Sequence, residues 1–263
     1  MLKPSPTTGD MASAKATDQA GTMTTDASVP RGVPPPPSMV APLWHTVLLL
    51  ATLLLLALGG ARLQSRSSSA PGVIAQHQGL TAIYLSTLVF EWALVGYVWL
   101  GIRRRTRLRD LVSGRWSRPR DVMRDLVIAV PFWGVFEATG WLMHVLLGPD
   151  TAKSISVLLP EGALEIALWV LVSASAGFCE EVVFRGYLQC QFHALSRSAL
   201  VAVLAQAVVF GISHGYQGGR QVVTISVLGL LYGLLAWWRH SLRPGMLAHA
   251  WGDIFSGIIS PRL

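Results

Sequence analysis

The chain has 263 residues, of which 13% are charged and 52% are hydrophobic. A soluble domain carries about 25% charged residues, so this composition excludes an ordinary soluble enzyme and indicates several membrane spans. The two cysteines exclude a disulfide-stabilised scaffold.

The first forty residues differ from the rest of the chain. They are rich in Thr, Ala, Ser, Asp and Pro, contain four consecutive prolines at 34–37 and show no apolar periodicity. Such a composition predicts a disordered tail. We therefore divide the chain into a disordered tail over residues 1–40 and a multi-span membrane domain over residues 41–263.

Apolar segments then follow one another along the chain. Each of the first three contains about 20 residues, enough to cross a hydrocarbon core of about 30 Å. We predict an all-α polytopic bundle of about seven transmembrane helices, with six to eight as the range. The segments cover residues 41–61, 80–102, 126–147, a stretch beginning near Glu161, 199–215, 222–238 and 246–259.

The arginines predict the orientation of these segments. Nine of the 18 arginines lie between Arg103 and Arg124, in the short loop that follows the second segment. Arginine in a short loop marks the cytoplasmic side of a membrane protein, so this loop and the N-terminus are predicted to be cytoplasmic. Seven spans would place the C-terminus outside.

The same topology accounts for the net charge of +7 and argues against a nucleic-acid partner, because a nucleic-acid-binding domain would spread basic residues over a folded face.

Ionisable side chains inside apolar segments are costly and are therefore candidate functional groups. The fourth segment carries Glu180, Glu181 and Arg185. Glu181 and Arg185 are four residues apart, which favours an ion pair on one helix face, and we expect this pair to be structural. Glu180 points about 100° away from Glu181 and has no cation within its helix, so it can serve as a general base or acid.

Register places a second motif beside the first. If the fourth helix continues to about Leu195 and the chain turns at Arg197, Glu180 lies 17 residues before that arginine and His214 lies 17 residues after it. Both side chains are then at the same depth, about 25 Å from the turn. Phe210 lies one turn before His214 and is expected to support the site by packing or by contacting the substrate.

The third motif pairs His249 with Asp253 on one face of the last segment. Gly252 and Gly257 beside them would permit another helix to approach closely. Three helices can therefore bring this pair to the first two motifs inside the bilayer. A carboxylate beside an imidazole can take a proton from water, and two further polar groups can stabilise the oxyanion of an attacked amide.

The three motifs, taken in this order, resemble those of the CPBP (Abi) family: Glu-Glu-x-x-x-Arg, Phe-x-x-x-His and His-x-x-x-Asp. That family includes eukaryotic type II CAAX prenyl endopeptidases and bacterial bacteriocin-processing or immunity proteins. The resemblance covers roughly residues 160–260 and implies a glutamate-type intramembrane endopeptidase. The residue roles that it implies are water activation by Glu180 and His214, oxyanion stabilisation by His249 and Asp253, and support from Glu181 and Arg185.

One position departs from that pattern, because the family often has Asn where this chain has Asp253. Asn can donate a hydrogen bond to an oxyanion, whereas an ionised Asp only accepts. Asp253 could be a protonated donor, a group that orients His249, or a metal ligand. We expect no cofactor, because the chain lacks His-Glu-x-x-His. If the enzyme were zinc-dependent, the ligands would be Glu180, His214, His249 and Asp253.

Two functions remain. The first is an intramembrane endopeptidase that acts on a membrane-associated protein or peptide, in a lipid bilayer that we expect to be a bacterial inner membrane. The alternative is a non-enzymatic transporter or immunity-type binding protein in which the same groups form a proton or ion site. The lack of an internal sequence repeat weakens the transporter alternative. The remaining ionisable residues in or near the spans are expected to serve packing, lipid-interface or accessory-cavity roles; they are Glu91, Glu137, His144 and Glu165.

Overall fold

The computed structural model describes residues 38–67, 77–148 and 158–259. Within these ranges every regular element is a helix, so the predicted all-α fold is confirmed. All the described residues belong to a single compact unit. The predicted tail over residues 1–40 lies outside the described residues except at its last three positions.

The helices follow the apolar segments. Helices α5, η2 and α6 continue into one another without a break, whereas η3 is a single 3-10 turn and η2 and η4 have π-helical hydrogen bonding. In chain order, the described helices are α1 (Leu43–Ser67), α2 (His77–Ile102), α3 (Leu108–Val112), α4 (Pro119–Leu147), α5 (Ala163–Glu180), η2 (Glu181–Leu188), α6 (Gln189–Ser196), α7 (Ala199–Ser213), η3 (Gly215–Gln217), α8 (Gly219–Arg239), α9 (Arg243–Ile254) and η4 (Phe255–Ile259).

Each of the seven predicted segments lies on a helix, but their lengths differ. Among the described residues, five helical runs are long and apolar enough to cross a membrane: α1, α2, α4, Ala163–Ser196 and α8. Helix α7 has 15 residues, and α9 together with η4, which continues it directly, has 17, so they extend only about 22 and 25 Å. The bundle therefore contains five full-length helices and two shorter ones, and the shorter two carry the second and third motifs.

The predicted turn after the fourth segment is confirmed. The helix continues to Ser196, and Arg197 follows in the left-handed conformation with φ of 55°. The Ser198 hydroxyl then accepts a hydrogen bond from the backbone N–H of Val201, which caps the start of α7. This short connection makes α6 and α7 antiparallel neighbours.

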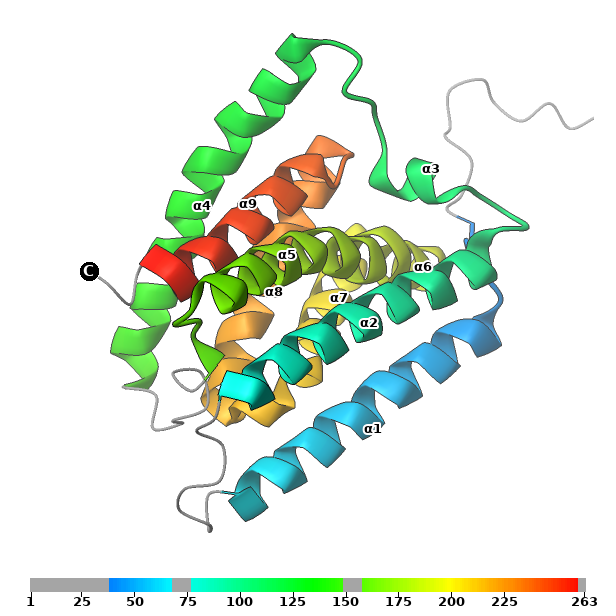
Figure 1. Ribbon diagram of the computed structural model, residues 1–263. Helices are drawn as coiled ribbons and strands as arrows, with labels where there is room; N and C mark the ends of the chain where they lie inside the picture. The colour runs from blue at the N-terminus through cyan, green and yellow to red at the C-terminus, as the bar shows by residue number, and fades with distance from the viewer. Residues whose placement is uncertain (1–37, 68–76, 149–157, 260–263) are drawn as a thin grey trace, which may run out of the picture. The chain divides into compact units, whose positions relative to one another are not determined.

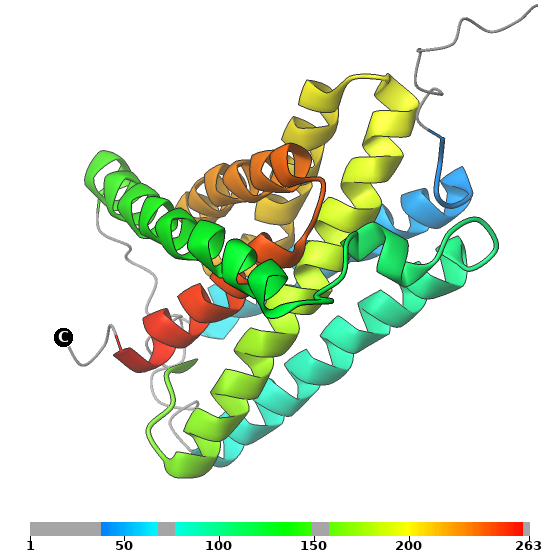
Figure 2. The ribbon, with the colours of Figure 1, turned by 90° about the horizontal axis from the view of Figure 1, so that it is seen from above.

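The continuous α5–η2–α6 helix lies at the centre of the packing. Helix α2 packs along one side of α5, and α9 crosses it on another side (Figure 1). Helix α8 packs closely against α7, and α4 flanks α8 and α9 (Figure 2). The buried apolar core is densest around η2, where Val182, Val183 and Tyr187 are at most 1% exposed.

Glycines allow the two closest helix crossings. A Cβ atom at Gly177 of α5 would lie 2.8 Å from both the Ala250 nitrogen and the Met246 oxygen of α9. A Cβ at Gly211 of α7 would lie 2.5 Å from the Val222 oxygen of α8. Both distances are too short for a side chain, so glycine is required for these backbones to approach.

The arginine-rich loop and the α8–α9 turn lie at the same end of the bundle. The Leu242 N–H donates to the Val112 oxygen at 3.0 Å. Arg105 Nη1 donates to the Met39 oxygen at 3.0 Å, which places the start of α1 at this end too. The basic segments therefore share one end, as the predicted topology requires.

Candidate active site

The three motifs meet at Glu180, where α5 passes into η2. The Glu180 carboxylate is 21% exposed, and two imidazole rings face its two oxygens. His214 Nε2 lies 4.0 Å from Glu180 Oε1, and His249 Nε2 lies 3.6 Å from Glu180 Oε2. The predicted register of Glu180 and His214 is confirmed, since residues 34 positions apart in the sequence face each other across the α6–α7 hairpin. The roles predicted for them are not tested by their proximity.

Each histidine is held by its other ring nitrogen. Nδ1 of His214 lies 2.8 Å from the Phe210 backbone oxygen, and Nδ1 of His249 lies 3.1 Å from Glu181 Oε1. Carbonyl and carboxylate oxygens only accept, so Nδ1 is the donor in both contacts. Both rings therefore turn Nε2 towards Glu180. This is the geometry in which one ring nitrogen orients the ring and the other is available for chemistry.

The predicted pair of Glu181 and Arg185 is present and buried. Arg185 Nη1 lies 3.0 Å from Glu181 Oε1, and both side chains are at most 1% exposed. The guanidinium carbon lies 4.2 Å from the Phe210 ring centre and 5.1 Å from that of Tyr232. Because Glu181 also accepts from His249, the pair connects η2, α7, α8 and α9. Phe210 lies inside this arrangement, 4% exposed, as a packing residue.

Asp253 lies at the edge of the cluster. Its Oδ2 atom is 3.8 Å from His249 Nε2, and its side chain is 35% exposed. The Asp253 backbone oxygen accepts from the Trp169 indole of α5 at 2.9 Å. A Cβ at Gly257 would overlap Trp169, at 2.2 Å from the ring, whereas one at Gly252 would meet Phe136 at 3.5 Å, an ordinary contact. Of the two glycines predicted to permit close approach, only Gly257 is needed for it.

An apolar cavity of about 310 Å³ opens beside the catalytic candidates. Glu180 and His214 line one side, and apolar side chains of α1 and α2 line the other. Glu91 of α2 also lines it, 5% exposed, with one carboxylate oxygen that has no hydrogen-bond partner among the described residues. The sequence assigned Glu91 an accessory role because it has no motif partner. Glu91 could have been identified from the sequence as a single ionisable residue in the middle of an apolar segment.

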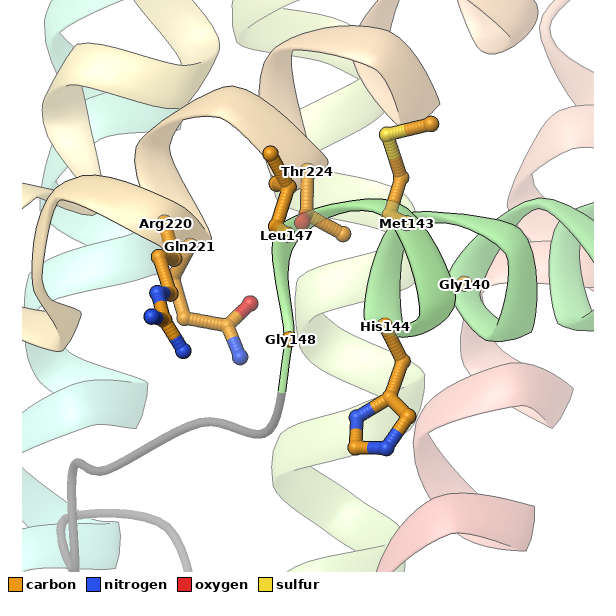
Figure 3. A pocket seen from close by; sticks show the side chains of 8 residues that line it. All are labelled: Gly140, Met143, His144, Leu147, Gly148, Arg220, Gln221 and Thr224. Carbon is orange, nitrogen blue, oxygen red and sulfur yellow. The ribbon is translucent and has the colours of Figure 1, made fainter.

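The other ionisable residues set aside from the sequence lie away from this cavity. Glu165 accepts from the backbone N–H groups of Glu161 and Gly162, so it satisfies the start of α5. Glu137 accepts from the Trp133 indole within α4 at 2.9 Å. His144 lines a separate cavity of about 70 Å³ between the end of α4 and the start of α8 (Figure 3). That cavity has room for a few waters and shares no lining residue with the first.

The fit of a metal ion can be tested on the donor set. Among the described residues, no group of three or more His, Cys, Asp or Glu side chains is arranged to hold one. In the cluster, Nδ1 of each histidine donates to a protein oxygen and Nε2 stays available, an arrangement that suits acid–base chemistry and a metal ligand equally. Glu181 is paired with Arg185 and is not a free ligand. The absence of zinc therefore stays a prediction.

Comparison with protein families identifies the segment that contains this cluster. Residues 162–255 match the model of the family described as type II CAAX prenyl endopeptidase Rce1-like. The matched segment begins at the start of α5 and ends beyond Asp253, so it contains all three motifs. No curated protein and no solved structure matches the chain significantly. Over residues 162–255, which contain all three motifs, the chain is therefore similar to the type II CAAX prenyl endopeptidase Rce1-like family.

Proposed function

We propose that this protein is an intramembrane endopeptidase that hydrolyses a peptide bond of a membrane-associated protein or peptide with a water activated by Glu180 and His214. The observation that supports this most directly is the position of Glu180 between two Nε2 atoms, at 4.0 and 3.6 Å. Both rings are fixed in that orientation through Nδ1. Positioned acid–base pairs of this kind are the usual means of activating water at neutral pH.

The separations leave room for the nucleophile. Contacts of 3.6 to 4.0 Å are longer than direct hydrogen bonds, so the groups are not bonded directly and a water molecule beside them can contact both. A water between Glu180 and His214 can donate one proton to the Glu180 carboxylate and the other to His214 Nε2. Its oxygen is then directed into the adjoining cavity, where a substrate carbonyl can lie.

His249 is the proposed oxyanion donor. Because its Nδ1 proton is used by Glu181, donation from Nε2 requires an imidazolium with protons on both nitrogens. Glu181 and Asp253 favour that form by charge, and Asp253 orients the ring rather than donating to the oxyanion itself. In this role Asp253 does not have to donate a hydrogen bond to the oxyanion, as the Asn often found at this position in the family could.

The hydrolysis consumes only the water molecule and the peptide bond. The water oxygen bonds to the amide carbon while Glu180 takes a proton, and the carbonyl oxygen gains the negative charge that His249 stabilises. Glu180, or His214 after proton exchange, returns the proton to the amide nitrogen. The carbon–nitrogen bond breaks, leaving a carboxylic acid and an amine.

The cavity supports a membrane-associated substrate. Leu53 and Leu56 of α1, together with Phe90 and Leu94 of α2, give the wall opposite Glu180 an apolar surface. An apolar side chain or lipid group adjacent to the scissile bond would bury its surface there at about 25 cal/mol per Å². We place the protein in a bacterial inner membrane with its N-terminus and arginine-rich loop in the cytoplasm.

The proposal is tested by comparing protein termini in membranes from cells that produce the wild type or Glu180→Gln. New N- or C-termini that appear only with the wild type are expected, and they would identify the substrate. Glu137→Gln is the matched control, since Glu137 lies in α4 and hydrogen-bonds only within that helix among the described contacts. Identical termini in wild-type and Glu180→Gln membranes would favour a transporter or binding protein instead.

Metal independence is part of the proposal and has its own measurement. Purified enzyme treated with a strong chelator is expected to retain its rate of cleavage, because Glu180 and His214 supply the acid–base chemistry. Loss of activity that zinc restores would assign Glu180, His214, His249 and Asp253 to a metal site.

A further inference from the structure

A second cluster of charged side chains lies where α4 begins, α8 ends and α9 begins. Asp125 of α4 is completely buried, and three guanidinium groups surround its carboxylate. The nearest nitrogen–oxygen distances are 3.3 Å to Arg124, 3.7 Å to Arg243 and 3.9 Å to Arg239. One carboxylate therefore faces three positive charges, and the cluster has a net charge of +2.

The cluster also has more hydrogen-bond donors than acceptors. Asp125 Oδ2 accepts from the Trp116 indole at 2.8 Å, and Oδ1 accepts from two nitrogens of Arg124 at 3.3 Å. Arg239 and Arg243 reach Asp125 only through the longer ion pairs. Arg239 Nε and Arg243 Nη1 are shielded from solvent and have no hydrogen-bond partner among the described residues, although Arg243 Nη1 is the atom that lies 3.7 Å from Asp125 Oδ2. Buried donors normally find acceptors, so this surplus points to an anion that the protein itself does not supply.

The position of the cluster indicates where that anion comes from. It lies at the end of the bundle that carries the arginine-rich loop, since Arg243 Nε donates to the Ser113 oxygen at 3.2 Å. The Trp116 ring lies against Arg243 and the Trp238 ring against Arg239, and both indoles are about half exposed or more. Exposed tryptophans at helix ends are typical of the level of lipid headgroups. The Arg124 and Arg239 side chains are 51% and 21% exposed, so the cluster is open to that layer.

We propose that this cluster binds the phosphate group of an anionic phospholipid. In this proposal Arg124 and Arg239 contact the phosphate oxygens. The negative charge of the phosphate also neutralises the buried positive charge of Arg243. Guanidinium groups suit this ligand because they present paired donors to phosphate oxygens. A zwitterionic lipid offers the same phosphate but carries an amine that the excess positive charge repels, so an anionic lipid is preferred. The proposal does not depend on the proteolytic activity.

A bound lipid would also influence the active site through α9. Arg243 begins α9, and His249 lies six residues further along the same helix. The phosphate would therefore hold the starts of α4 and α9 and the end of α8 together. Its effect is expected first on stability and lipid affinity, which can be measured without a substrate.

The test uses the full chain in neutral detergent micelles, titrated with phosphatidylglycerol, phosphatidylcholine or inorganic phosphate. Phosphatidylglycerol is expected to raise the unfolding temperature by a few degrees and to remain bound in native mass spectra. Phosphatidylcholine and millimolar inorganic phosphate are expected to do neither. An equal shift with phosphatidylcholine would overturn the preference for anionic lipid, and an equal shift with inorganic phosphate would show a free-anion site instead.

The variants separate this site from general surface charge. Arg239→Gln is expected to weaken phosphatidylglycerol binding about fivefold, the effect of one basic side chain near an anionic surface. Arg104→Gln removes the same charge from an exposed position in the arginine-rich loop and is expected to leave binding unchanged. Equal loss in the two variants would show that only the overall positive charge attracts the lipid, and would overturn the proposal.

A third variant distinguishes a lipid site from an internal clamp. Asp125→Asn removes the only carboxylate that the described contacts place among the three arginines. If the cluster binds phosphate, this variant is destabilised in neutral micelles but gains more stability from phosphatidylglycerol than the wild type does. If the cluster is only a clamp, the variant is destabilised and phosphatidylglycerol does not restore it, which contradicts the proposal. Arg239→Lys keeps the charge but loses the paired donors, so it is expected to recover only part of the phosphatidylglycerol binding that Arg239→Gln loses.

Discussion

The two sides of Glu180 are built in opposite ways. Towards α9, the carboxylate faces His249, whose ring is held by Glu181, and the charge of Glu181 is in turn neutralised by Arg185. On the same side, α5 crosses α9 at Gly177 without room for a side chain. Towards α1 and α2, the carboxylate faces an apolar cavity of about 310 Å³. The difference teaches that polar groups are fixed where they must stay oriented, and that space is left where a substrate has to enter.

The largest effect is expected on the polar side when His214 is removed. In His214→Ala the water loses its second partner beside Glu180, and the rate of cleavage should fall by about 10²- to 10⁴-fold. The measurement is the cleavage rate of purified protein whose unfolding temperature matches the wild type. His144→Ala is the control, because His144 lines the separate cavity between α4 and α8. A folded His214→Ala enzyme with full activity would remove His214 from the chemistry.

Breaking the ion pair should affect stability before chemistry. Arg185→Ala leaves Glu181 as a buried charge without its cation and is expected to cost about 3 to 5 kcal/mol of stability. Yield from membranes and the unfolding temperature are the measurements. Arg185→Lys, which restores a cation, should recover part of the stability. A variant of normal stability without activity would instead place Arg185 in the chemistry.

The close helix crossing should tolerate no added atom. In Gly177→Ala the new Cβ would lie 2.8 Å from backbone atoms of α9, and the strain is expected to cost about 1 to 3 kcal/mol. Because His249 moves with α9, activity should fall together with the unfolding temperature. Gly134→Ala in α4 is the matched control, since its Cβ would meet nothing within 4 Å. Equal unfolding temperatures for the two variants would contradict the importance of this crossing.

The smallest effect is expected on the cavity side, at Glu91. Glu91→Gln keeps the size of the side chain and removes its acidity, and we expect a decrease in activity of less than about tenfold, because Glu91 lines the cavity but contacts neither histidine in the described structure. A decrease as large as that of His214→Ala would make Glu91 part of the proton chemistry. Substrate dependence of the rate separates an effect on binding from an effect on turnover.

The sequence was informative where helix geometry alone determined the outcome. A turn at Arg197 with straight helices on both sides is sufficient to bring Glu180 and His214 to one depth, and spacing of four residues is sufficient to pair Glu181 with Arg185. The seven apolar segments could be predicted from hydropathy, including the shorter ones at 199–215 and 246–259. Their packing around the continuous helix depends on contacts between distant segments, which no local pattern records.

The features that the sequence did not reveal all depend on contacts between distant segments. Glu91 has no motif partner, and its importance comes from the cavity that α1 and α2 form with η2. Gly177 lies among other small residues, so its close contact with α9 cannot be distinguished by composition. Arg124 was interpreted only as part of a topological signal, and Asp125 was not singled out, because burial of Asp125 depends on α8 and α9 folding against α4.

The central claim is that the Glu180 carboxylate is the base that activates the water. The most direct measurement is the single-turnover rate of purified Glu180→Gln on a substrate identified from membrane termini, with Glu137→Gln measured beside it. The account predicts a loss of at least about 10²-fold for Glu180→Gln at unchanged unfolding temperature, and a wild-type rate for Glu137→Gln. Cleavage by folded Glu180→Gln at the wild-type rate would contradict it.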